Sequence, residues 1–465
     1  MTVQVAHFAP FYERMAAEQL PDIFINNFAH YYEKLVAGDD GMLSEQSIVP
    51  VDSLTDADKL PHNLESVGRE VVGRTVIIKL NGGLGTGMGL TGPKSLLQVK
   101  EGLTFLDIIA RQAIGIGSPL LLMNSFATDG ASLDVLSRYP NLDRKLPLSF
   151  LQHKQPKVSA VDFSPAKFPD DPELEWCPPG HGDLYVALAT SGILDRLLAA
   201  GFEYAFVSNA DNLGAVLDMR ILGYFASHRL PFLMEVADRT PADRKGGHLA
   251  QRPDGQLILR EIAQCPAEDM GAFQDIGRHR YFNTNNLWLH LPTLQNVLIE
   301  RDYHLGLPMI RNRKTIDPRD PESTAVYQLE TAMGSAIEVF NDAAAIRVPR
   351  SRFAPVKKTE DLLAVRSDAY VLTPDNRVVL VPERAGTPPT VELIGDCYRF
   401  VSDLDAHFPA GAPSLRWCDY LLVEGEFEFG QGITLRGNVR FRNTNCKCKI
   451  VPDGLTLENS EWPCH

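Results

Sequence analysis

The stretch TVIIKLNGGLGTGMGLTGPKSL, residues 75 to 96, joins an apolar run to a glycine-rich loop. The run TVIIKL is short and rich in β-branched residues, which is typical of a buried strand. Parallel α/β sheets bind their ligands in the crevice at the carboxyl ends of the strands. A glycine-rich loop that directly follows such a strand therefore predicts a ligand site at this edge of a sheet.

The spacing of the glycines separates three phosphate-binding motifs. In a nucleoside-triphosphatase P-loop, G-x-x-x-x-G-K-[ST], the lysine comes immediately after the second glycine. Here Pro93 separates Gly92 from Lys94, and its ring disturbs the helix start that a P-loop requires. The glycines at 87, 89 and 92 do match the dinucleotide fingerprint G-x-G-x-x-G. That fingerprint needs a helix, whereas the following SLLQVKEG is typical of an extended segment that then turns.

The third motif, a nucleotidyltransferase loop, fits these residues better. Glycines at 82, 83, 85, 87 and 89 let the backbone approach a ligand closely and direct N–H groups at phosphate oxygens. Pro93 stiffens the segment that presents Lys94, whose side chain can place a positive charge on a triphosphate. So many glycines after a buried strand are costly without a ligand, so we favour this interpretation over a flexible linker.

The region from about 72 to 365 alternates between β-branched runs and helical stretches. SPLLLMN, YAFVSN and PFLMEVAD are predicted strands, and TFLDIIARQAI and GDLYVALATSGILDRLLAAG are predicted helices. Such alternation predicts an α/β fold with a doubly wound, mostly parallel sheet and helices on both faces. The preceding segment has apolar residues at helical spacing. We therefore predict an N-terminal helical segment (1–70) and a catalytic domain (71–370).

Residues 371–465 form a third region, of different character. Apolar pairs recur in it six residues apart, at Phe427/Phe429, Ile433/Leu435 and Val439/Phe441. Short alternating units with turn residues between them predict the rungs of a parallel β-helix, with an antiparallel meander as the alternative. A stack of rungs with open ends invites pairing with another copy, so a homo-oligomer could form through this region.

The composition limits the classes of binding partner and the cellular compartments that can be expected. A formal net charge of −14 argues against a broad nucleic-acid surface. No uninterrupted apolar run approaches the ~20 residues of a membrane span, so no membrane partner is expected. The segment MTVQVAHFAPFYERMAAEQL lacks the basic and apolar parts of a secretory signal. Seven irregularly spaced cysteines do not make a disulfide framework, so the cytoplasm is the expected compartment.

Six blocks of the sequence together resemble one family. LNGGLGTGMGLTGPKSL resembles the signature of the UTP–glucose-1-phosphate uridylyltransferases, also called UDP-glucose pyrophosphorylases. The other blocks follow in that family's order: PPGHGDLYVAL (178–188), FVSNADNLGAVLD (206–218), FNTNNLWL (282–289), QLETAMGSAI (328–337) and VPRSRFAPVKKTEDLL (348–363). The resemblance implies a doubly wound, Rossmann-like nucleotidyltransferase core and a C-terminal left-handed parallel β-helix.

The resemblance also implies a reaction. UTP and α-D-glucose 1-phosphate give UDP-glucose and pyrophosphate, reversibly and with Mg²⁺, by in-line attack on the α-phosphate. The protein then has to neutralise and align two anions rather than supply a nucleophile. Lys94 and Lys357 are the implied catalytic cations. Asp211, at the end of the predicted strand YAFVSNAD, is the implied Mg²⁺ ligand, because Mg²⁺ prefers oxygen and needs few protein ligands.

Two further sets of residues are expected to bind the substrates. The nucleotide set implied by the resemblance is Leu80, Asn81, Gly82, Gly83, Lys94, Gln152, Gly180, Asp211 and Lys357. In this set the amide of Gln152 offers both a donor and an acceptor to the imide edge of uracil. The sugar-phosphate set is His181, Asn209, Asn283, Asn285 and Glu330. Strand alternation would put Asn283 and Asn285 on one face, where neutral amides suit hydroxyl groups.

Other interpretations stay open. A pyrophosphorylase for N-acetylglucosamine or galactose 1-phosphate is an alternative, because sugar choice depends on pocket shape. A catalytically silent sugar-nucleotide-binding module would be expected to lack Lys94 or Asp211, and the glycine fingerprint leaves a dehydrogenase as the alternative of another class. Lys314 or Lys358 could share the phosphate contacts. Zinc is not favoured at Cys446, Cys448, Cys464 and His465, because C-x-C on one strand face suits a β-helix core equally well.

Overall fold

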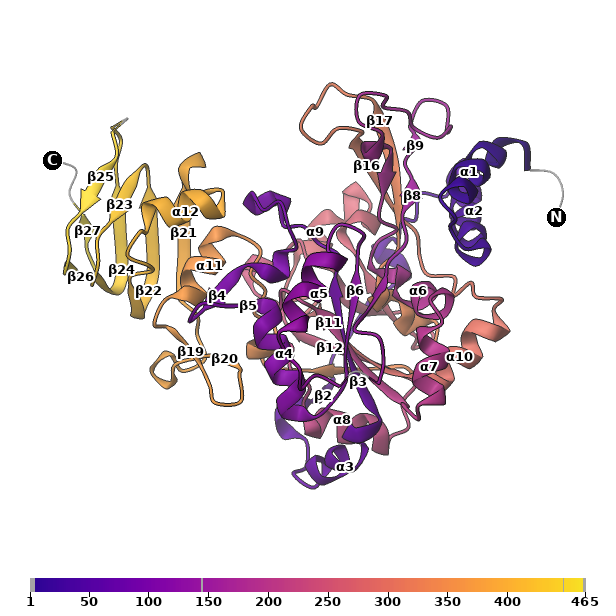
Figure 1. Cartoon of the computed structure of the whole chain (residues 1–465), viewed down its shortest axis with the longest axis horizontal. Helices are drawn as coiled ribbons and strands as arrows, with labels where there is room; N and C mark the ends of the chain where they lie inside the picture. The colour runs from indigo at the N-terminus through magenta and orange to yellow at the C-terminus, as the bar shows by residue number, and fades with distance from the viewer. Residues whose placement is uncertain (1–4, 144, 446, 463–465) are drawn as a thin grey trace.

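The structure, a computed structural model, describes residues 5–143, 145–445 and 447–462. Figure 1 shows two N-terminal helices at one end, a central α/β body, and a stack of short strands at the other end. Within these ranges, no helix combines the length and the apolar composition that crossing a bilayer requires. The central body positions most of the predicted site.

A large mixed sheet forms the centre of this body. Its main path of neighbouring strands is β2 (Thr55–Asp56), β18 (Ala344–Arg347), β12 (Phe232–Asp238), β15 (Tyr281–His290), β11 (Tyr204–Asn209), β3 (Thr75–Asn81), β6 (Leu120–Asn124) and β7 (Ser149–Leu151). All neighbours on this path are parallel except the two pairs that involve β15. The predicted α/β class with a sheet dominated by parallel strands is therefore confirmed.

Helices cover both faces of the sheet. Val76 and Ile78 of β3 enter one hydrophobic core, and Ile77 between them enters another. The first core contains α6 (Leu184–Thr190), α7 (Ile193–Ala199) and α10 (Leu291–Glu300). The second contains α4 (Phe105–Ile116), α5 (Asp129–Ser137) and α8 (Met219–Ser227). The sheet is thus doubly wound, as the alternation of elements predicts.

One predicted helix is in fact two. The stretch GDLYVALATSGILDRLLAAG forms α6 and α7, separated by Ser191 and Gly192. Gly192 has a φ of +69°, in the left-handed region that ends the helical path and that glycine adopts without a steric cost. The expectation of one helix was wrong because the apolar spacing continues across this turn.

The N-terminal residues are helical and also contribute to the sheet. α1 (Val5–Ala17) and α2 (Asp22–Val36) confirm the predicted helices. β2 then forms an end of the main path, β1 (Val49–Pro50) pairs with β13 (His248–Gln251), and α3 (Leu64–Val71) follows. The predicted domain boundaries at 70 and 370 stay predictions.

Smaller sheets and helices surround the body. They are β4 (Gln98–Lys100) with β5 (Leu103–Thr104), β8 (Gln155–Pro156) with β10 (Trp176–Cys177), β16 (Ile310–Thr315) with β17 (Ala325–Glu330) and β9 (Val158–Ser159), β19 (Tyr370–Leu372) with β20 (Val378–Leu380), α9 (Met270–Gln274) and α11 (Thr359–Arg366). β14 (Leu257–Arg260) pairs with β13 and belongs to the large sheet. Together, β17 and the loop that follows it supply residues of the predicted sugar site.

The C-terminal strands stack in parallel. One ladder runs β21 (Thr390–Ile394), β22 (Ser414–Glu424), β24 (Thr434–Arg442) and β26 (Thr456–Glu458), with β27 (Glu461–Trp462) also on β24. A second ladder joins β23 (Phe427–Phe429) to β25 (Lys449–Val451), and α12 (Val401–His407) precedes β22. The predicted apolar pairs are buried. Because these described ladders are parallel, the antiparallel meander was the wrong alternative.

The C-terminal stack shares a hydrophobic core with the glycine-rich loop. Met88 of the loop and Val356 lie in the same buried cluster as Phe427, Val439 and other residues of the stack. The ring of Phe400 lies so near the loop that a Cβ atom on Gly89 would come within 2.8 Å of it. The stack is therefore packed directly against the loop that is expected to hold the nucleotide.

Candidate active site

The predicted site is built at the carboxyl ends of two neighbouring parallel strands, β3 and β11. Asn209, the last residue of β11, pairs with Leu80 of β3, and the Ala210 N–H donates to the Leu80 carbonyl over 3.0 Å. The next residue on one side is Asp211, and the glycine-rich loop begins on the other. Sheet topology therefore brings together two motifs that lie far apart in the sequence.

Lys94 and Asp211 meet at these strand ends. The backbone N–H of Lys94 donates to the Gly83 carbonyl over 3.0 Å, which folds the loop back onto its own start. The Lys94 ammonium then donates from Nζ to Asp211 Oδ2 over 2.6 Å. Only 16% of the lysine side chain and 24% of the aspartate side chain are exposed. The pair is therefore largely shielded from solvent but still accessible to a ligand. Lys94 begins a short 3-10 turn, and the next α-helix starts only at Phe105, so the loop lacks the helix of a dinucleotide motif.

The segment that carries Lys357 lies against the Asp211 loop. The Val356 N–H donates to the Asp211 carbonyl over 3.2 Å. The Asn212 side chain accepts from the Ala354 N–H over 2.9 Å and donates to the Arg352 carbonyl over 3.2 Å. The Lys357 side chain is exposed, and its Nζ lies 5.8 Å from the centre of the Phe353 ring. The structure thus brings the backbone of this segment to Asp211 and leaves the Lys357 ammonium at the surface.

A buried ion pair beneath this segment was not foreseen from the sequence. The Glu235 carboxylate accepts from Arg352 Nε over 2.8 Å and from Arg352 Nη2 over 2.7 Å. It also accepts from the Trp288 indole over 2.9 Å and from the Asn286 amide over 3.0 Å. The Glu235 side chain is fully buried. Since Arg352 also bonds to Asn212 through its carbonyl, the pair fixes the position of the Asp211 loop.

Lys79 is a second buried charge that sequence reasoning did not single out. Its Nζ donates to the Ser208 hydroxyl and to the Ala215 carbonyl, each over 2.7 Å, so it ties β3 to β11 and to the loop beyond. Burial, with a smaller contribution from the nearby Arg352, lowers the pKa of Lys79 to about 7. The sequence does contain a signal for this residue, because Lys79 lies inside the apolar run TVIIKL and a buried cation needs hydrogen-bond partners.

Gln152 lies directly beside Gly82. A Cβ atom on Gly82 would come within 2.7 Å of the Gln152 side-chain oxygen. Only glycine at position 82 therefore leaves enough room for the Gln152 amide in this position. The next residue, His153, is buried, and its Nδ1 lies 2.8 Å from the Asp183 carboxylate, which also accepts from the His153 N–H over 2.7 Å. This pair connects the Gln152 segment to the loop of Gly180.

His181 is held as a neutral imidazole. The Met333 N–H donates to its Nδ1 over 2.9 Å, so the remaining ring proton belongs on Nε2. Burial lowers the pKa of His181 to about 4. Gly180 before it has a φ of +81°, and a Cβ atom there would lie 2.5 Å from the Thr331 carbonyl. The close packing of the Gly180 loop against the Thr331–Met333 segment therefore fixes the position of the His181 ring, which was predicted to face the sugar phosphate.

The two predicted amides of β15 contact each other. Asn283 donates from its side chain to Asn285 over 2.8 Å and accepts from the Asn285 N–H over 2.9 Å. The strict alternation that we expected is interrupted, because the ladder to β12 shifts register here and Asn285 has a φ of +59°. Asparagine tolerates this left-handed conformation better than most residues. The two side chains meet because of this bulge.

The sugar-site residues converge from three segments. A Cβ atom on Gly334 would lie 2.8 Å from the Asn283 amide, and one on Gly180 would lie 3.0 Å from the Glu330 side chain. Gly334 follows Met333, the partner of His181, so the amides, the imidazole and the carboxylate line one region. Asn209 ends β11 near the Lys94 pair and is half-buried. The structure thus brings the predicted sugar-site residues of three segments close to one another.

Three other features were predicted: Lys314, Lys358 and the cysteine–histidine group. Lys314 of β16 pairs with Val326 of β17 and its side chain is exposed, and Lys358, next to Lys357, is also exposed. Cys446, Cys464 and His465 lie outside the described residues. Cys448 is exposed, so the expectation that it fills a β-helix core was wrong.

Comparison with known proteins agrees with this geometry. The profile of the family described as UTP–glucose-1-phosphate uridylyltransferase matches residues 22–436. This chain belongs to that family. A probable UTP–glucose-1-phosphate uridylyltransferase of Schizosaccharomyces pombe is 38% identical over 460 residues, which cover 96% of this chain and 88% of the relative. The corresponding protein of Saccharomyces cerevisiae is 42% identical and covers 86% of this chain and 79% of its own length.

Solved structures of uridylyltransferases share the whole architecture. A variant of UDP-glucose pyrophosphorylase from Leishmania major in complex with UDP-glucose has a TM-score of 0.90 and 42% identity, and covers 98% of this chain and 99% of its own. A UDP-glucose phosphorylase from Trypanosoma brucei has a TM-score of 0.89 and 44% identity with the same coverage. The similarity therefore includes the C-terminal stack and is not confined to the nucleotidyltransferase core.

Proposed function

We propose that this chain catalyses the reversible reaction of UTP with α-D-glucose 1-phosphate to give UDP-glucose and pyrophosphate. The observation that carries the proposal is the Lys94–Asp211 pair, because it sets a cation and a carboxylate together beside a glycine-rich loop at the carboxyl ends of β3 and β11. That arrangement suits a triphosphate and its metal ion. Membership of the uridylyltransferase family identifies the substrates. A pyrophosphorylase for another sugar is not favoured by the relatives.

In this proposal the chain's own groups bind and align two phosphates. The loop glycines direct backbone N–H groups at the triphosphate, and Lys94 exchanges its bond to Asp211 for one to a phosphate oxygen. Lys357, whose backbone segment lies against Asp211 and whose side chain is exposed, adds a second positive charge. His181 is neutral at physiological pH and donates from Nε2 to the sugar phosphate without needing to be protonated. The phosphate oxygen of the sugar then attacks the α-phosphorus in line.

We propose that Mg²⁺ binds at Asp211. The Asp211 carboxylate is partly exposed and stands beside the proposed triphosphate site, so its oxygens can be shared with a metal. One carboxylate with phosphate oxygens and waters suits Mg²⁺, which rarely uses an all-protein cage. When bound, Mg²⁺ would neutralise the charge that builds up on the leaving pyrophosphate. Asp211 would hold the ion, and Lys94 would remain free for phosphate.

The remaining assignments belong to the same proposal. Gln152 reads the uracil edge beside Gly82, and backbone groups from Leu80 to Gly83, with Gly180, hold the nucleoside. Asn283, Asn285 and Glu330 face the hexose, with Asn209 near the phosphate. The C-terminal parallel stack is a left-handed β-helix that can join two copies, and the protein works in the cytoplasm. Support for the stack comes from its parallel ladders, and the other assignments rest on the convergence of these residues.

The experiment that tests the function measures pyrophosphate release from UTP with a panel of sugar 1-phosphates. We expect glucose 1-phosphate to give the highest kcat/KM, and UTP to be preferred over ATP, GTP and CTP. A faster reaction with N-acetylglucosamine 1-phosphate or galactose 1-phosphate would contradict the proposed sugar. Binding of UDP-glucose without any pyrophosphate release would contradict the proposed catalysis.

A further inference from the structure

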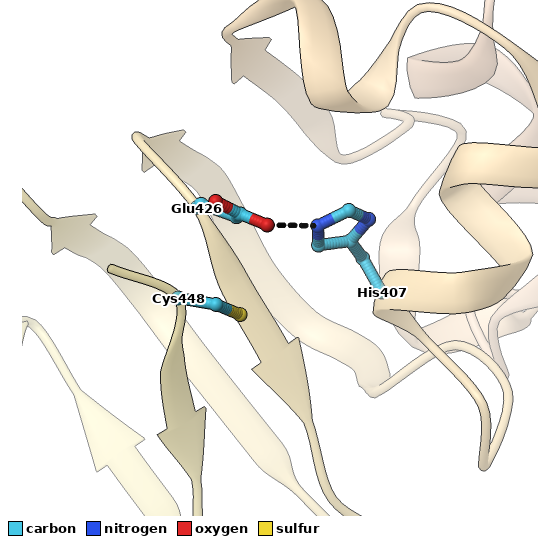
Figure 2. A group of neighbouring side chains, drawn as sticks. All are labelled: His407, Glu426 and Cys448. Atoms are coloured by element: carbon cyan, nitrogen blue, oxygen red, sulfur yellow. Dashed lines mark ion pairs between the residues drawn. The ribbon is translucent and has the colours of Figure 1, made fainter. Parts of the chain in front are cut away.

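Three side chains of types that can bind a metal ion converge in the C-terminal stack, away from the proposed active site. They are His407 at the end of α12, Glu426 just before β23, and Cys448 just before β25 (Figure 2). One ligand atom of each lies within 4.8 Å of the other two. The His407 Nε2 and the Glu426 Oε1 are 3.5 Å apart. Imidazole, carboxylate and thiol groups from three separate segments therefore face one point.

The parallel ladder explains why Glu426 and Cys448 are neighbours. Phe427 of β23 pairs with Lys449 of β25, and the Lys449 N–H donates to the Glu426 carbonyl over 3.1 Å. Glu426 and Cys448 thus precede equivalent positions of two paired strands, which lie about 4.8 Å apart in a sheet. Their closeness is built into the backbone and does not depend on flexible side chains alone.

The His407 ring is oriented as in metal sites. Its Nδ1 lies 2.7 Å from the Asp403 carbonyl, and a carbonyl can only accept, so Nδ1 carries the proton. The other ring nitrogen, Nε2, faces the Glu426 carboxylate at 3.5 Å. Tyr398 packs edge-on against the ring at 5.0 Å between centroids. Metal-binding histidines almost always have their other nitrogen bonded to a carbonyl or carboxylate in this way.

We propose that His407, Glu426 and Cys448 bind one Zn²⁺ ion. A set of one nitrogen, one oxygen and one sulfur suits zinc, and the thiol disfavours Mg²⁺ and Ca²⁺. Tetrahedral bonds of ~2.0 Å place nitrogen and oxygen ligands about 3.3 Å apart, close to the separation of His407 Nε2 and Glu426 Oε1. Three protein ligands leave a fourth position, which a water can fill.

The proposed site is connected to the nucleotide loop through α12. Phe400 immediately precedes this helix, and His407 is its last residue. An ion held here would fasten α12 to two strands of the stack. Since Phe400 packs on Gly89 of the nucleotide loop, the ion would stabilise the wall of that loop without touching the substrate.

The test measures metal in the full chain. Protein stripped with a chelator and then given Zn²⁺ is expected to retain about one ion per chain after desalting. Co²⁺ in its place should give the charge-transfer band of a thiolate–cobalt bond. Cys448→Ser should abolish that band, and His407→Gln should weaken Zn²⁺ affinity by at least about 100-fold. Both side chains are at least partly exposed, so neither change should prevent folding.

Control variants separate this site from other thiols. Cys265→Ser changes a buried cysteine of the central body and should leave zinc binding unchanged. Cys446→Ser tests the neighbouring cysteine of the C-x-C pair, and zinc should be retained. The proposal is overturned if the full chain takes up neither Zn²⁺ nor Co²⁺. It is also overturned if Cys446→Ser releases the ion while His407→Gln keeps it, because the ligands would then be a different set.

Discussion

Lys94 donates a 2.6 Å hydrogen bond from Nζ to Oδ2 of Asp211, across the carboxyl ends of two parallel strands. Each residue neutralises the other at the position where we propose that the triphosphate and its metal ion bind. The pair keeps the lysine extended toward the crevice, so less side-chain freedom is lost when it transfers to phosphate. Substrate binding is thus an exchange of partners between groups that are already in place.

Replacing Lys94 with alanine should reduce kcat by a factor on the order of 10²–10³, because a positive charge next to the reacting phosphates is lost. The fold should be retained, since the side chain sits at the wall of a crevice. Lys145→Ala is the matched control, because that lysine is 81% exposed and also pairs with an aspartate, Asp143. Steady-state kinetics with circular dichroism would check both. A kcat near that of the unchanged protein would remove Lys94 from the mechanism.

Asp211→Asn preserves the size of the side chain and removes its charge. We expect kcat to fall by about 10²-fold or more and the Mg²⁺ concentration for half-maximal rate to rise, because an amide is a poorer ligand for Mg²⁺. Asp143→Asn, at the exposed pair, should change neither quantity. Rates titrated with Mg²⁺ at saturating UTP give the measurement. An unchanged Mg²⁺ titration would show that another group holds the ion.

His181 predicts a specific dependence of stability on pH. Burial lowers its folded-state pKa to about 4, whereas an unfolded-chain histidine titrates near ~6.5. Between these values the unfolded chain binds the proton more readily, so this residue's contribution to stability is complete above pH ~6.5 and is lost as the pH falls toward ~4. His181→Gln has no such proton. The difference in Tm between the protein and the variant should therefore shrink from pH 7 to pH 5.

Comparing the two proteins at each pH cancels the titration of the other buried histidines. His290→Gln is a useful second variant, because burial also lowers the pKa of His290, which lies at the far end of β15. It should reproduce the stability effect without changing kcat. A Tm difference for His181→Gln that stays constant with pH would contradict a neutral imidazole at this position.

Local sequence patterns predicted the strand and the glycine-rich loop with Lys94, and the family resemblance implied Asp211. TVIIKL is recognisable as a strand because its apolar residues suit burial on both faces. The glycines and Lys94 follow it in the order that a phosphate-binding loop requires. The direction of each strand could not be predicted in this way. β15 lies antiparallel between two strands of the parallel path, and its apolar run is no different from that of a parallel strand. Direction is decided by the connections, which local patterns do not contain.

The buried supports of the site could be suspected but not paired from the sequence. A glutamate inside the apolar run PFLMEVAD had to find a partner, since an unpaired buried charge is very costly. Its partner, Arg352, is 117 residues away, and no local rule selects it from the other arginines. The bulge at Asn285 is similar, because only the ladder to β12 reveals the shifted register.

Breaking the buried pair should be costly. Arg352→Met leaves the Glu235 carboxylate buried without its cation, and such losses typically cost about 3–5 kcal/mol of stability. Adding Glu235→Gln should recover part of this, because the uncompensated charge is gone. Arg69→Met removes an exposed pair with Glu65 and should change stability by no more than about 0.5 kcal/mol. Denaturant unfolding measures all three, and equal costs for Arg69 and Arg352 would contradict the argument.

The last prediction concerns Gly82 and Gln152, which are proposed to act as one unit in reading uracil. Gln152→Ala removes the amide and should lower kcat/KM for UTP by roughly tenfold, the value of one or two hydrogen bonds. It should also reduce the preference for UTP over CTP. Gly82→Ala leaves the amide in the chain, but the added Cβ would sit 2.7 Å from its oxygen and must push it aside. We expect nearly the same two changes from this variant.

The double variant decides between a shared and a separate role. If Gly82→Ala acts only by displacing the Gln152 amide, it should cost little in a protein that already lacks that amide, so the two losses should not add. Gly73→Ala is the control for an added methyl group, because nothing lies within 4 Å of its Cβ position and it precedes β3, outside the loop. Its kcat/KM should match that of the unchanged protein. Losses that add in full would mean that Gly82 and Gln152 contribute to UTP binding independently, and the uracil contact would then have to be sought elsewhere in the crevice.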